Sequence, residues 1–197
     1  MSKDALADEI LVVDLESTCW EKGKEPKDQV SDIIEIGVAH LNRKTLEVTK
    51  NWTNYVKPTR SDISEFSMKL NGITEEMVNL KGIALDSAFD ILRLVEKSKQ
   101  RTWASYGNYD RRKMEDDARD HKLPYPMSPR HINVKTLFSV TYDLDKEVGM
   151  AEALKILNMP LKGIHHNGMD DAYNIAKILS HLIGVARTGI PKVTVNF

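Results

Sequence analysis

The sequence predicts an α/β domain in which a mixed central sheet of about five strands is flanked by α-helices. Strand-like segments lead the chain, and segments with helical periodicity then alternate with further short strands. The first strand candidate, Ile10 to Val13, is apolar without alternation, which is typical of a strand that is buried on both faces. Such a strand belongs in the centre of a covered sheet.

Three strands are expected first, and two shorter ones later. After the Ile10 to Val13 run and a charged connector, VSDIIEIGVAHLN and TLEVTKNWTNYVKP flank the polar turn NRKT, a pattern that predicts a strand, a hairpin and another strand. The short apolar segment TWASY, residues 102 to 106, ends at Gly107 and predicts a fourth strand. A fifth is expected near HINV.

Helical periodicity begins near Ser64. SEFSMKLNG and TEEMVNL predict short helices, with Ser64 and Thr74 as N-caps and Gly72 as a stop. Further helices are expected over Tyr109 to His121, around Lys135 to Tyr142 and around Met150 to Leu157. Two amphipathic helices that should cover the sheet are marked by Leu85, Ala88, Phe89, Leu92 and Val95, and by Ala172, Ile175, Ala176, Leu179 and Ile183.

Composition favours one soluble domain over residues 1–197, with a core at about 10–184 and a C-terminal tail at 185–197. No apolar run approaches the roughly 18 residues of a membrane span. The beginning, MSKDALADE, lacks the apolar centre of a signal peptide, and Cys19 is the only cysteine, so we expect a cytoplasmic protein. A net charge of -1 argues against a generally basic surface that coats nucleic acid.

Two carboxylates follow the first apolar run. Asp14 and Glu16 are two residues apart, so on a strand they would point to the same side. In the alternative, the strand ends at Val13 and the acids begin a solvated turn. Asp110 follows the fourth strand in the same way, and if the first and fourth strands are adjacent and parallel, all three acids meet at one sheet edge.

The segment GIHHNGMDDAYNIAKIL, residues 163 to 179, adds His166 and Asp171 where a loop enters the last helix. Alone, an Asp at a helix start is typical of capping and of the helix dipole, and histidines are common in loops. Four carboxylates in one cleft would raise one another's pKa, however, and divalent cations resolve that repulsion. Oxygen ligands without a cysteine cluster favour two Mg²⁺ or Mn²⁺ ions, which promote phosphoester hydrolysis when about 3.5 to 4 Å apart. A histidine beside them could accept the proton of the attacking water.

The segments DLESTCW, SYGNYDR and HHNGMDD resemble the three motifs of the DEDDh 3′–5′ exonucleases, which have an RNase H-like fold. The similarity extends over roughly Ile10 to Gly184. It is strongest to the branch that contains the 3′ histone mRNA exonuclease and bacterial sporulation-inhibitor-like exonucleases. The resemblance implies that Asp14 bridges two metal ions, that Glu16, Asp110 and Asp171 complete the ligand set, and that His166 is the general base.

Some neighbouring positions depart from the family or compete with these roles. Leu15 and Ser17 replace the Phe and Ala that are common in this branch, and neither side chain is a metal ligand. His165 could compete for the role of base, but the five-residue gap to Asp171 selects His166. Asp170 is expected to cap the helix or to lie just outside the metal ligands.

The resemblance also implies a surface for the terminal nucleotide. The predicted substrate contacts are Leu15, Ser17, Thr18, Phe66, Leu70, Asn71, Thr74 and Tyr109. Core packing is an alternative role for Phe66, Leu70 and Tyr109. The basic run RRK, residues 111 to 113, could meet phosphates but is more typical of a solvated helix face.

The predicted activity is metal-dependent 3′–5′ hydrolysis of single-stranded nucleic-acid ends that releases nucleoside 5′-monophosphates, with RNA favoured over DNA by the resemblance alone. Two alternatives stay open. A haloacid-dehalogenase-type phosphatase is suggested by DLEST, but Glu16 stands where that scheme needs Asp, and Asp110 and His166 would have no role. The other is a catalytically silent nucleic-acid-binding or regulatory protein.

Overall fold

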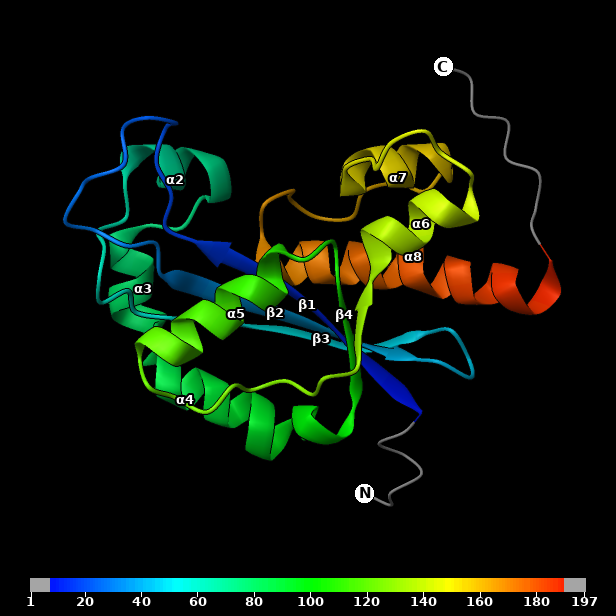
Figure 1. Ribbon diagram of the computed structural model, residues 1–197, viewed down its shortest axis with the longest axis horizontal. Helices are drawn as coiled ribbons and strands as arrows, with labels where there is room; N and C mark the ends of the chain where they lie inside the picture. Colours follow the sequence, from blue (N-terminus) through cyan, green and yellow to red (C-terminus); the bar gives the residue numbers. More distant parts are fainter. Residues whose placement is uncertain (1–7, 190–197) are drawn as a thin grey trace.

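The computed structural model describes residues 8–189, which fold around one five-stranded sheet (Figure 1). The strands lie in the order β3-β2-β1-β4-β5. Their bounds are Glu9–Ser17 for β1, Ile33–Asn42 for β2, Val48–Tyr55 for β3, Thr102–Ser105 for β4 and His131–Asn133 for β5. All five match the strands predicted from the sequence.

The sheet is mixed, and β1 is its central strand. β1 pairs with β2 in the antiparallel sense and with β4 in the parallel sense, and β4 is parallel to β5. Leu11 of β1 lies opposite Trp103 of β4. The first and fourth strands are therefore adjacent and parallel, which is the condition under which the acids at their ends meet.

Helices cover both faces of the sheet (Figure 1). On one face lie α6, α7 and α8, and on the other lie α4 and α5, while α2 and α3 cover the edge near β3. The helices are α2 (Glu65–Asn71), α3 (Glu75–Lys81), α4 (Leu85–Asp90), α5 (Tyr109–Asp120), α6 (Val134–Thr141), α7 (Met150–Ile156) and α8 (Gly168–Thr188), with a π-helical turn, η1 (Ile91–Val95), and a 3₁₀ turn, η2 (Ser98–Gln100).

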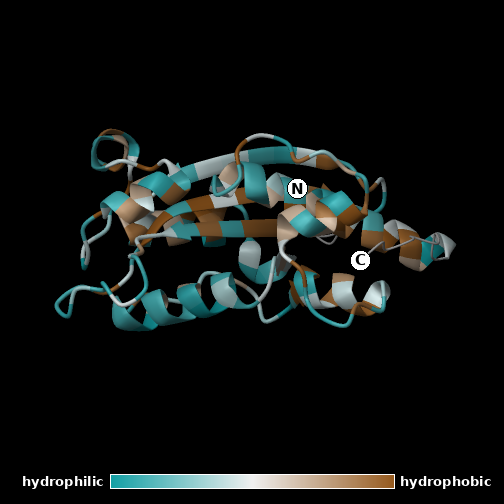
Figure 2. Ribbon diagram, turned by 90° about the horizontal axis from the view of Figure 1, so that it is seen from above, coloured by the Kyte–Doolittle hydropathy of each residue, from teal (hydrophilic) through white to brown (hydrophobic). Residues whose placement is uncertain are grey.

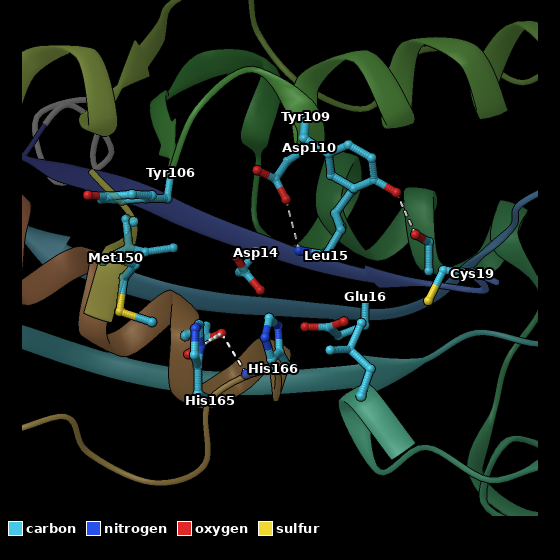
Figure 3. A pocket seen from close by; sticks show the side chains of 15 residues that line it. Asp14, Leu15, Glu16, Cys19, Tyr106, Tyr109, Asp110, Met150, His165 and His166 are labelled. Atoms are coloured by element: carbon cyan, nitrogen blue, oxygen red, sulfur yellow. Dashed lines mark hydrogen bonds and ion pairs between the residues drawn. The ribbon is translucent and has the colours of Figure 1, made fainter. Parts of the chain in front are cut away.

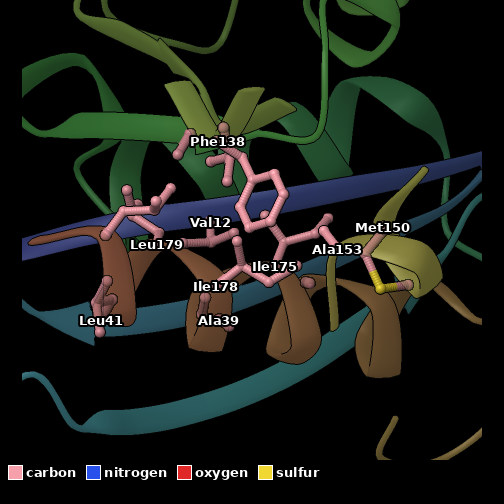
Figure 4. Close-up of a cluster of buried hydrophobic side chains, with 14 of the residues drawn as sticks. Val12, Ala39, Leu41, Phe138, Met150, Ala153, Ile175, Ile178 and Leu179 are labelled. Atoms are coloured by element: carbon pink, nitrogen blue, oxygen red, sulfur yellow. The ribbon is translucent and has the colours of Figure 1, made fainter. Parts of the chain in front are cut away.

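The alternation of side chains along β1 divides the core in two. Ile10 and Val12 pack towards α8 and the α6–α7 pair, in a cluster that includes Phe138 and Ile175 (Figure 4). Leu11 and its odd-numbered neighbours in β1 pack instead against α4 and α5. Because side chains of even-numbered residues face α8, the same alternation turns both acids of β1 towards that helix.

Apolar residues are concentrated in the middle layer, and the highly charged α5 is mostly hydrophilic (Figure 2). No helix within residues 8–189 combines the length and the apolar character needed to cross a membrane.

The predicted helix ends are confirmed. The side chain of Ser64 accepts a hydrogen bond from Ser67 N, and that of Thr74 accepts one from Met77 N, so both are N-caps. Gly72 ends α2 with a left-handed φ of 73°.

One helical prediction is wrong. Val95 was expected on the face that covers the sheet, yet it is 65% exposed, whereas Phe89 and Leu92 are buried. The physical reason is the π-helical turn η1, in which Glu96 N donates to Ile91 O. A wider turn changes the angle between successive residues and rotates Val95 away from the core.

Candidate active site

The two acids of β1 lie within the strand rather than in a turn. β1 continues to Ser17, and Glu16 is only 8% exposed, while Asp14 is half-buried. The alternative of a solvated turn after Val13 is therefore wrong. Both carboxylates face the N-terminal end of α8.

Asp110 joins the strand ends from the other side. It lies in the first turn of α5, directly beyond β4, and is 4% exposed. Its Oδ1 accepts a hydrogen bond of 3.1 Å from the backbone N of Leu15. This contact fixes the third acid against the strand that carries the first two.

Asp171 lies in the first turn of α8 and holds the preceding loop. Its Oδ2 accepts a hydrogen bond of 2.9 Å from the backbone N of His166 and lies 2.9 Å from Nδ1 of His165. The two imidazole rings are stacked, with centroids 4.1 Å apart. His166 has a left-handed φ of 66°, which turns the loop towards the helix. Both histidines therefore lie beside the acids.

Asp170 also holds this loop, although the N-cap of α8 is Asn167, whose side chain accepts from Asp170 N. Asp170 Oδ2 accepts a hydrogen bond of 2.8 Å from Ile164 N. Asn174, one turn further, binds both backbone groups of Lys162. The first turns of α8 thus fix the position of the histidines.

Sequence reasoning missed a fifth buried acid, Glu35. It is fully buried in β2, directly opposite Glu16 in the antiparallel pair. Its carboxylate accepts hydrogen bonds from Gly168 N (2.9 Å) and from Thr53 Oγ1 (2.8 Å). A charge within the apolar run IIEIG was the available signal, and it is the same kind of signal that singled out Asp14 and Glu16.

Glu35 belongs to a close contact between β2 and α8. A Cβ built on Gly37 would lie 2.0 Å from the backbone of Gly168, so the two glycines let strand and helix approach. The first turn of α8 is thereby seated on the sheet. Because that turn carries Asp171, the contact sets the position of one site carboxylate relative to those of β1.

The site is electrostatically unbalanced. Burial, followed by the charges of Asp110 and Asp171, raises the pKa of Asp14 well above its usual value. Burial, followed by the charges of Glu35 and Asp171, raises the pKa of Glu16 to about 8. Burial also raises the pKa of Asp110 to about 6. Within residues 8–189, no lysine or arginine forms an ion pair with these carboxylates.

These residues fit a divalent cation. Ligand oxygens of Asp14, Glu16 and Asp171 lie within 4.8 Å of one another, as do ligand atoms of His165, His166 and Asp171. The buried Oδ1 of Asp171 has no hydrogen-bond partner among the described residues. A buried carboxylate oxygen without a partner is costly, and a hard cation with oxygen ligands would satisfy it.

The acids open into a cavity of about 420 Å³ (Figure 3). Its wall includes the four acids Asp14, Glu16, Asp110 and Asp171 and the two histidines His165 and His166. The five residues predicted to be catalytic therefore share one solvent-accessible cavity.

A family comparison identifies the arrangement. The family model described as "Exonuclease" matches residues 11–179. The chain belongs to this exonuclease family.

The curated relatives include human 3′–5′ exoribonuclease 1, which is 29% identical over 189 residues covering 91% of this chain and 54% of the human protein. Human ERI1 exoribonuclease 2 is 26% identical over 204 residues, covering 90% of this chain and 29% of that protein. The chain thus spans about half, or less, of the length of these relatives.

Solved exonuclease structures agree with the fold. The nuclease domain of 3′hExo, a DEDDh family member bound to rAMP, has a TM-score of 0.76 at 27% identity, with coverage of 93% of this chain and 94% of that domain. A 3′-exonuclease in a structure of 3′-end-specific recognition of the histone mRNA stem-loop has a TM-score of 0.77 at 28% identity, with coverage of 90% and 64%. The predicted DEDDh resemblance and RNase H-like fold are confirmed. The haloacid-dehalogenase alternative is wrong, since the mixed sheet and the family are those of an exonuclease.

Among the predicted substrate contacts of this exonuclease domain, Leu15, Ser17, Leu70 and Tyr109 line the cavity. Tyr109 is 55% exposed and Leu70 is 40% exposed, so neither is a core residue. The hydroxyl groups of Ser17 and Tyr109 lie 2.5 Å apart and join the end of β1 to the start of α5.

The other four predicted contacts lie outside the cavity wall. Phe66 is 42% exposed on α2, so it is not a core residue. Thr18 is buried and bonds to Ser61 and Asp32, Asn71 is buried and accepts from Ile73 N, and Thr74 caps α3. For these four, contact with substrate stays a prediction.

The basic run at the start of α5 is already paired in part. Arg111 pairs with Glu115 at 2.9 Å, and Lys113 pairs with the buried Asp117 at 2.8 Å. These contacts favour the solvated and structural role over phosphate binding.

Proposed function

We propose that the chain is a divalent-metal-dependent 3′–5′ exonuclease that acts on single-stranded 3′ ends, with RNA favoured over DNA. The observation that carries the proposal is the convergence of Asp14, Glu16, Asp110 and Asp171 beside a histidine pair in one open cavity. Acids gathered without a balancing cation, next to a proton acceptor, suit hydrolysis at phosphorus.

The relatives support the substrate class. The 3′hExo nuclease domain was solved with rAMP, and the similar 3′-exonuclease was solved in a structure of 3′-end-specific recognition of a histone mRNA stem-loop. A bound ribonucleoside monophosphate is the kind of product that 3′–5′ trimming releases. We therefore favour RNA ends as substrate and nucleoside 5′-monophosphates as products.

The four carboxylates would hold the cations. Asp14, whose neighbours include both Asp110 and Asp171, would contribute to the binding of both ions, and Glu16, Asp110 and Asp171 would complete the ligand set. When bound, two cations would supply the positive charge that activates the attacking water and stabilises the leaving oxygen. The fold of S. pombe Pop2p, solved in an Mg²⁺- and Mn²⁺-bound form, is similar at a TM-score of 0.66 and 16% identity.

His166 would accept the proton of the attacking water. Burial lowers the pKa of His166, and the neighbouring His165 lowers it further, so the imidazole is neutral and able to accept a proton near neutral pH. His165 instead directs its Nδ1 to Asp171. Asp171 accepts a hydrogen bond from the backbone N of His166, so this contact does not engage the nitrogens of the His166 ring.

The experiment is digestion of matched 5′-labelled RNA and DNA oligonucleotides with Mg²⁺, Mn²⁺ or EDTA. We expect a ladder that shortens from the 3′ end, is abolished by EDTA, and forms faster on RNA. Intact oligonucleotides under every condition, with RNA still bound, would instead support the catalytically silent binding protein.

The histidine assignment has its own test. His166→Ala should reduce turnover near neutral pH by roughly 10²-fold or more, the usual contribution of a general base, with little change in the Mg²⁺ concentration needed for half-maximal rate. His165→Ala is the matched control. Full activity of His166→Ala together with loss in His165→Ala would transfer the role of base to His165.

A further inference from the structure

The cavity extends to both sides of the acids. On one side of Asp14 lie Glu16 and Cys19, and on the other lie Tyr106 and Met150 (Figure 3). The predicted contacts for the terminal nucleotide belong to the first side. The second side has no role in the proposed function so far.

Three residues build this second side, which we call the Tyr106 wall: Tyr106, Gly149 and Met150. Tyr106 follows β4 and packs against the core cluster, and its hydroxyl donates to Val148 O at 3.0 Å. Met150 begins α7 and is 6% exposed, so its position is fixed by the core. Contacts within the protein therefore hold both side chains of the wall.

Gly149 leaves the wall open. It is exposed, and a Cβ built on it would meet nothing within 4 Å. Its φ of -68° is ordinary for any L-residue. Space for a ligand thus adjoins the aromatic ring and the thioether.

The direction of a bound strand follows from the reaction. The bond that is cut joins the terminal and penultimate nucleotides, and the phosphorus must lie at the acids. If the terminal nucleotide lies beside Leu70 and Tyr109, the penultimate nucleotide must leave the acids on the opposite side. That side is the Tyr106 wall.

We propose that the Tyr106 wall is a subsite for the penultimate nucleotide, whose base packs on the half-buried Tyr106 ring, with Met150 behind it in the core. This inference rests on the proposed exonuclease function. No charged side chain belongs to the wall, and the Tyr106 hydroxyl is already bonded to Val148, so stacking rather than hydrogen bonding would bind the base. Because every base has a π-face, this subsite tolerates any sequence.

The test uses two 5′-labelled single-stranded oligonucleotides, of whichever sugar the wild type cleaves faster. One is intact, and the other has an abasic residue at the penultimate position. Wild type should remove the first nucleotide about 10- to 100-fold more slowly from the abasic strand, the usual contribution of one stacked base. Tyr106→Ala should slow cleavage of the intact strand by a similar factor and should show no further loss on the abasic strand.

A merely structural role of Tyr106 would give a different result. Its loss would slow both strands equally, and that outcome would overturn the subsite. Tyr106→Phe keeps the ring and should keep the difference between intact and abasic strands. If wild type cleaves both strands at one rate, the subsite is wrong, whereas failure of wild type to cleave either strand would instead reject the exonuclease function.

A second variant does not disturb the core. Gly149→Trp adds bulk in open space, so it should block intact strands by at least about 10-fold without a shift in melting temperature. Val140→Trp on α6, where Val140 is 74% exposed, is the control for an added surface tryptophan and should cleave at the wild-type rate. Wild-type cleavage by Gly149→Trp would contradict the proposed path of the strand.

Discussion

Buried or half-buried carboxylates lie near both ends of the central strand, but lysine and arginine side chains pair with them at only one end. Near the start of β1, Glu9 pairs with Arg101, and Glu96 lies 2.8 Å from Lys50 and 2.9 Å from His40. Near the end of β1, no lysine or arginine within residues 8–189 pairs with the site carboxylates, and the contact of His165 Nδ1 with Asp171, at 2.9 Å, involves a side chain that is charged only when protonated.

The pKa values of two glutamates, one from each end, show the effect of these pairs. Burial raises the pKa of Glu96, but the pairs with His40 and Lys50 outweigh that effect and lower the pKa to about 2. Burial raises the pKa of Glu16 as well, and neighbouring acids then raise it to about 8. Burial alone therefore does not indicate a site. Acids that pair with lysine or arginine are expected to be structural, and acids without such a partner are expected to bind a cation.

The sharpest way to break this comparison is to remove one unbalanced acid. Asp14→Asn should lower exonuclease activity by roughly 10³-fold or more, because the several kcal/mol supplied by metal-assisted catalysis would be lost. Its unfolding free energy in EDTA should nevertheless stay the same or rise by about 1 to 3 kcal/mol, since repulsion is relieved. Chemical denaturation and a nuclease assay measure both. A less stable variant would show that Asp14 is structural.

The seat of α8 should be nearly as sensitive. Gly37→Ala would place a Cβ 2.0 Å from the backbone of Gly168, so we expect a loss of about 3 kcal/mol in stability or a displaced α8. Displacement would raise the Mg²⁺ concentration needed for activity, because Asp171 moves with the helix. Thermal unfolding and a metal titration distinguish the two results, and wild-type behaviour in both would contradict the close contact.

Removing a balanced acid should have the opposite signature. Glu96→Gln should lower the unfolding free energy by about 2 to 3 kcal/mol, since it removes the buried carboxylate charge that pairs with Lys50 and leaves His40 with Glu9 as its remaining acidic partner. Its exonuclease activity should match that of the wild type at a temperature where both are folded. Loss of activity in the folded variant would refute the division between the two ends.

The pH dependence of stability should also differ in sign. The lowered pKa of Glu96 contributes stability above pH 4.5 that is lost as the pH falls towards 2. The raised pKa of Glu16 means that, in EDTA, stability falls as the pH rises from 4.5 to about 8, because the native state retains a proton that the unfolded state releases.

Chemical denaturation of Glu96→Gln and Glu16→Gln between pH 2 and 8 separates the two contributions. Glu16→Gln should reduce the fall in unfolding free energy between pH 4.5 and 8, by roughly 2 to 4 kcal/mol at pH 8. Saturating Mg²⁺ should flatten it in the wild type too. Parallel curves for wild type and Glu16→Gln would contradict the unbalanced site.

The smallest effect serves as a control on α8. A Cβ on Gly184 would meet only the side chain of Leu46, at 3.5 Å, an ordinary contact. Gly184→Ala should therefore raise stability by up to about 1 kcal/mol through helix propensity, with unchanged activity. A destabilised variant would indicate that α8 tolerates less change than the comparison with Gly37 assumes.

The sequence was sufficient where local patterns decide the structure. Uninterrupted apolar runs predicted the strands, and Ser64, Thr74 and Gly72 predicted helix ends through their own hydrogen bonds and φ. The spacing of Asp14 and Glu16 predicted a shared face once a strand was assumed.

The rest depends on pairing between distant segments. Glu35 lies opposite Glu16 only in the register that β1 and β2 adopt, and no spacing within either segment specifies that register. The π-helical turn that exposes Val95 arises where α4 packs on the sheet, and the Tyr106 wall requires β4 and α7 to meet. Such features are tertiary, so single-segment patterns did not predict them.

The backbone of His166 has a consequence for protein engineering. A non-glycine residue at φ 66° costs about 1 kcal/mol or more relative to glycine, so a search for heat-resistant variants would select His166→Gly. That variant would gain robustness and lose its proton acceptor. Free imidazole added to the assay should then restore part of the turnover. The loop is thus a position at which stability and catalysis favour different residues.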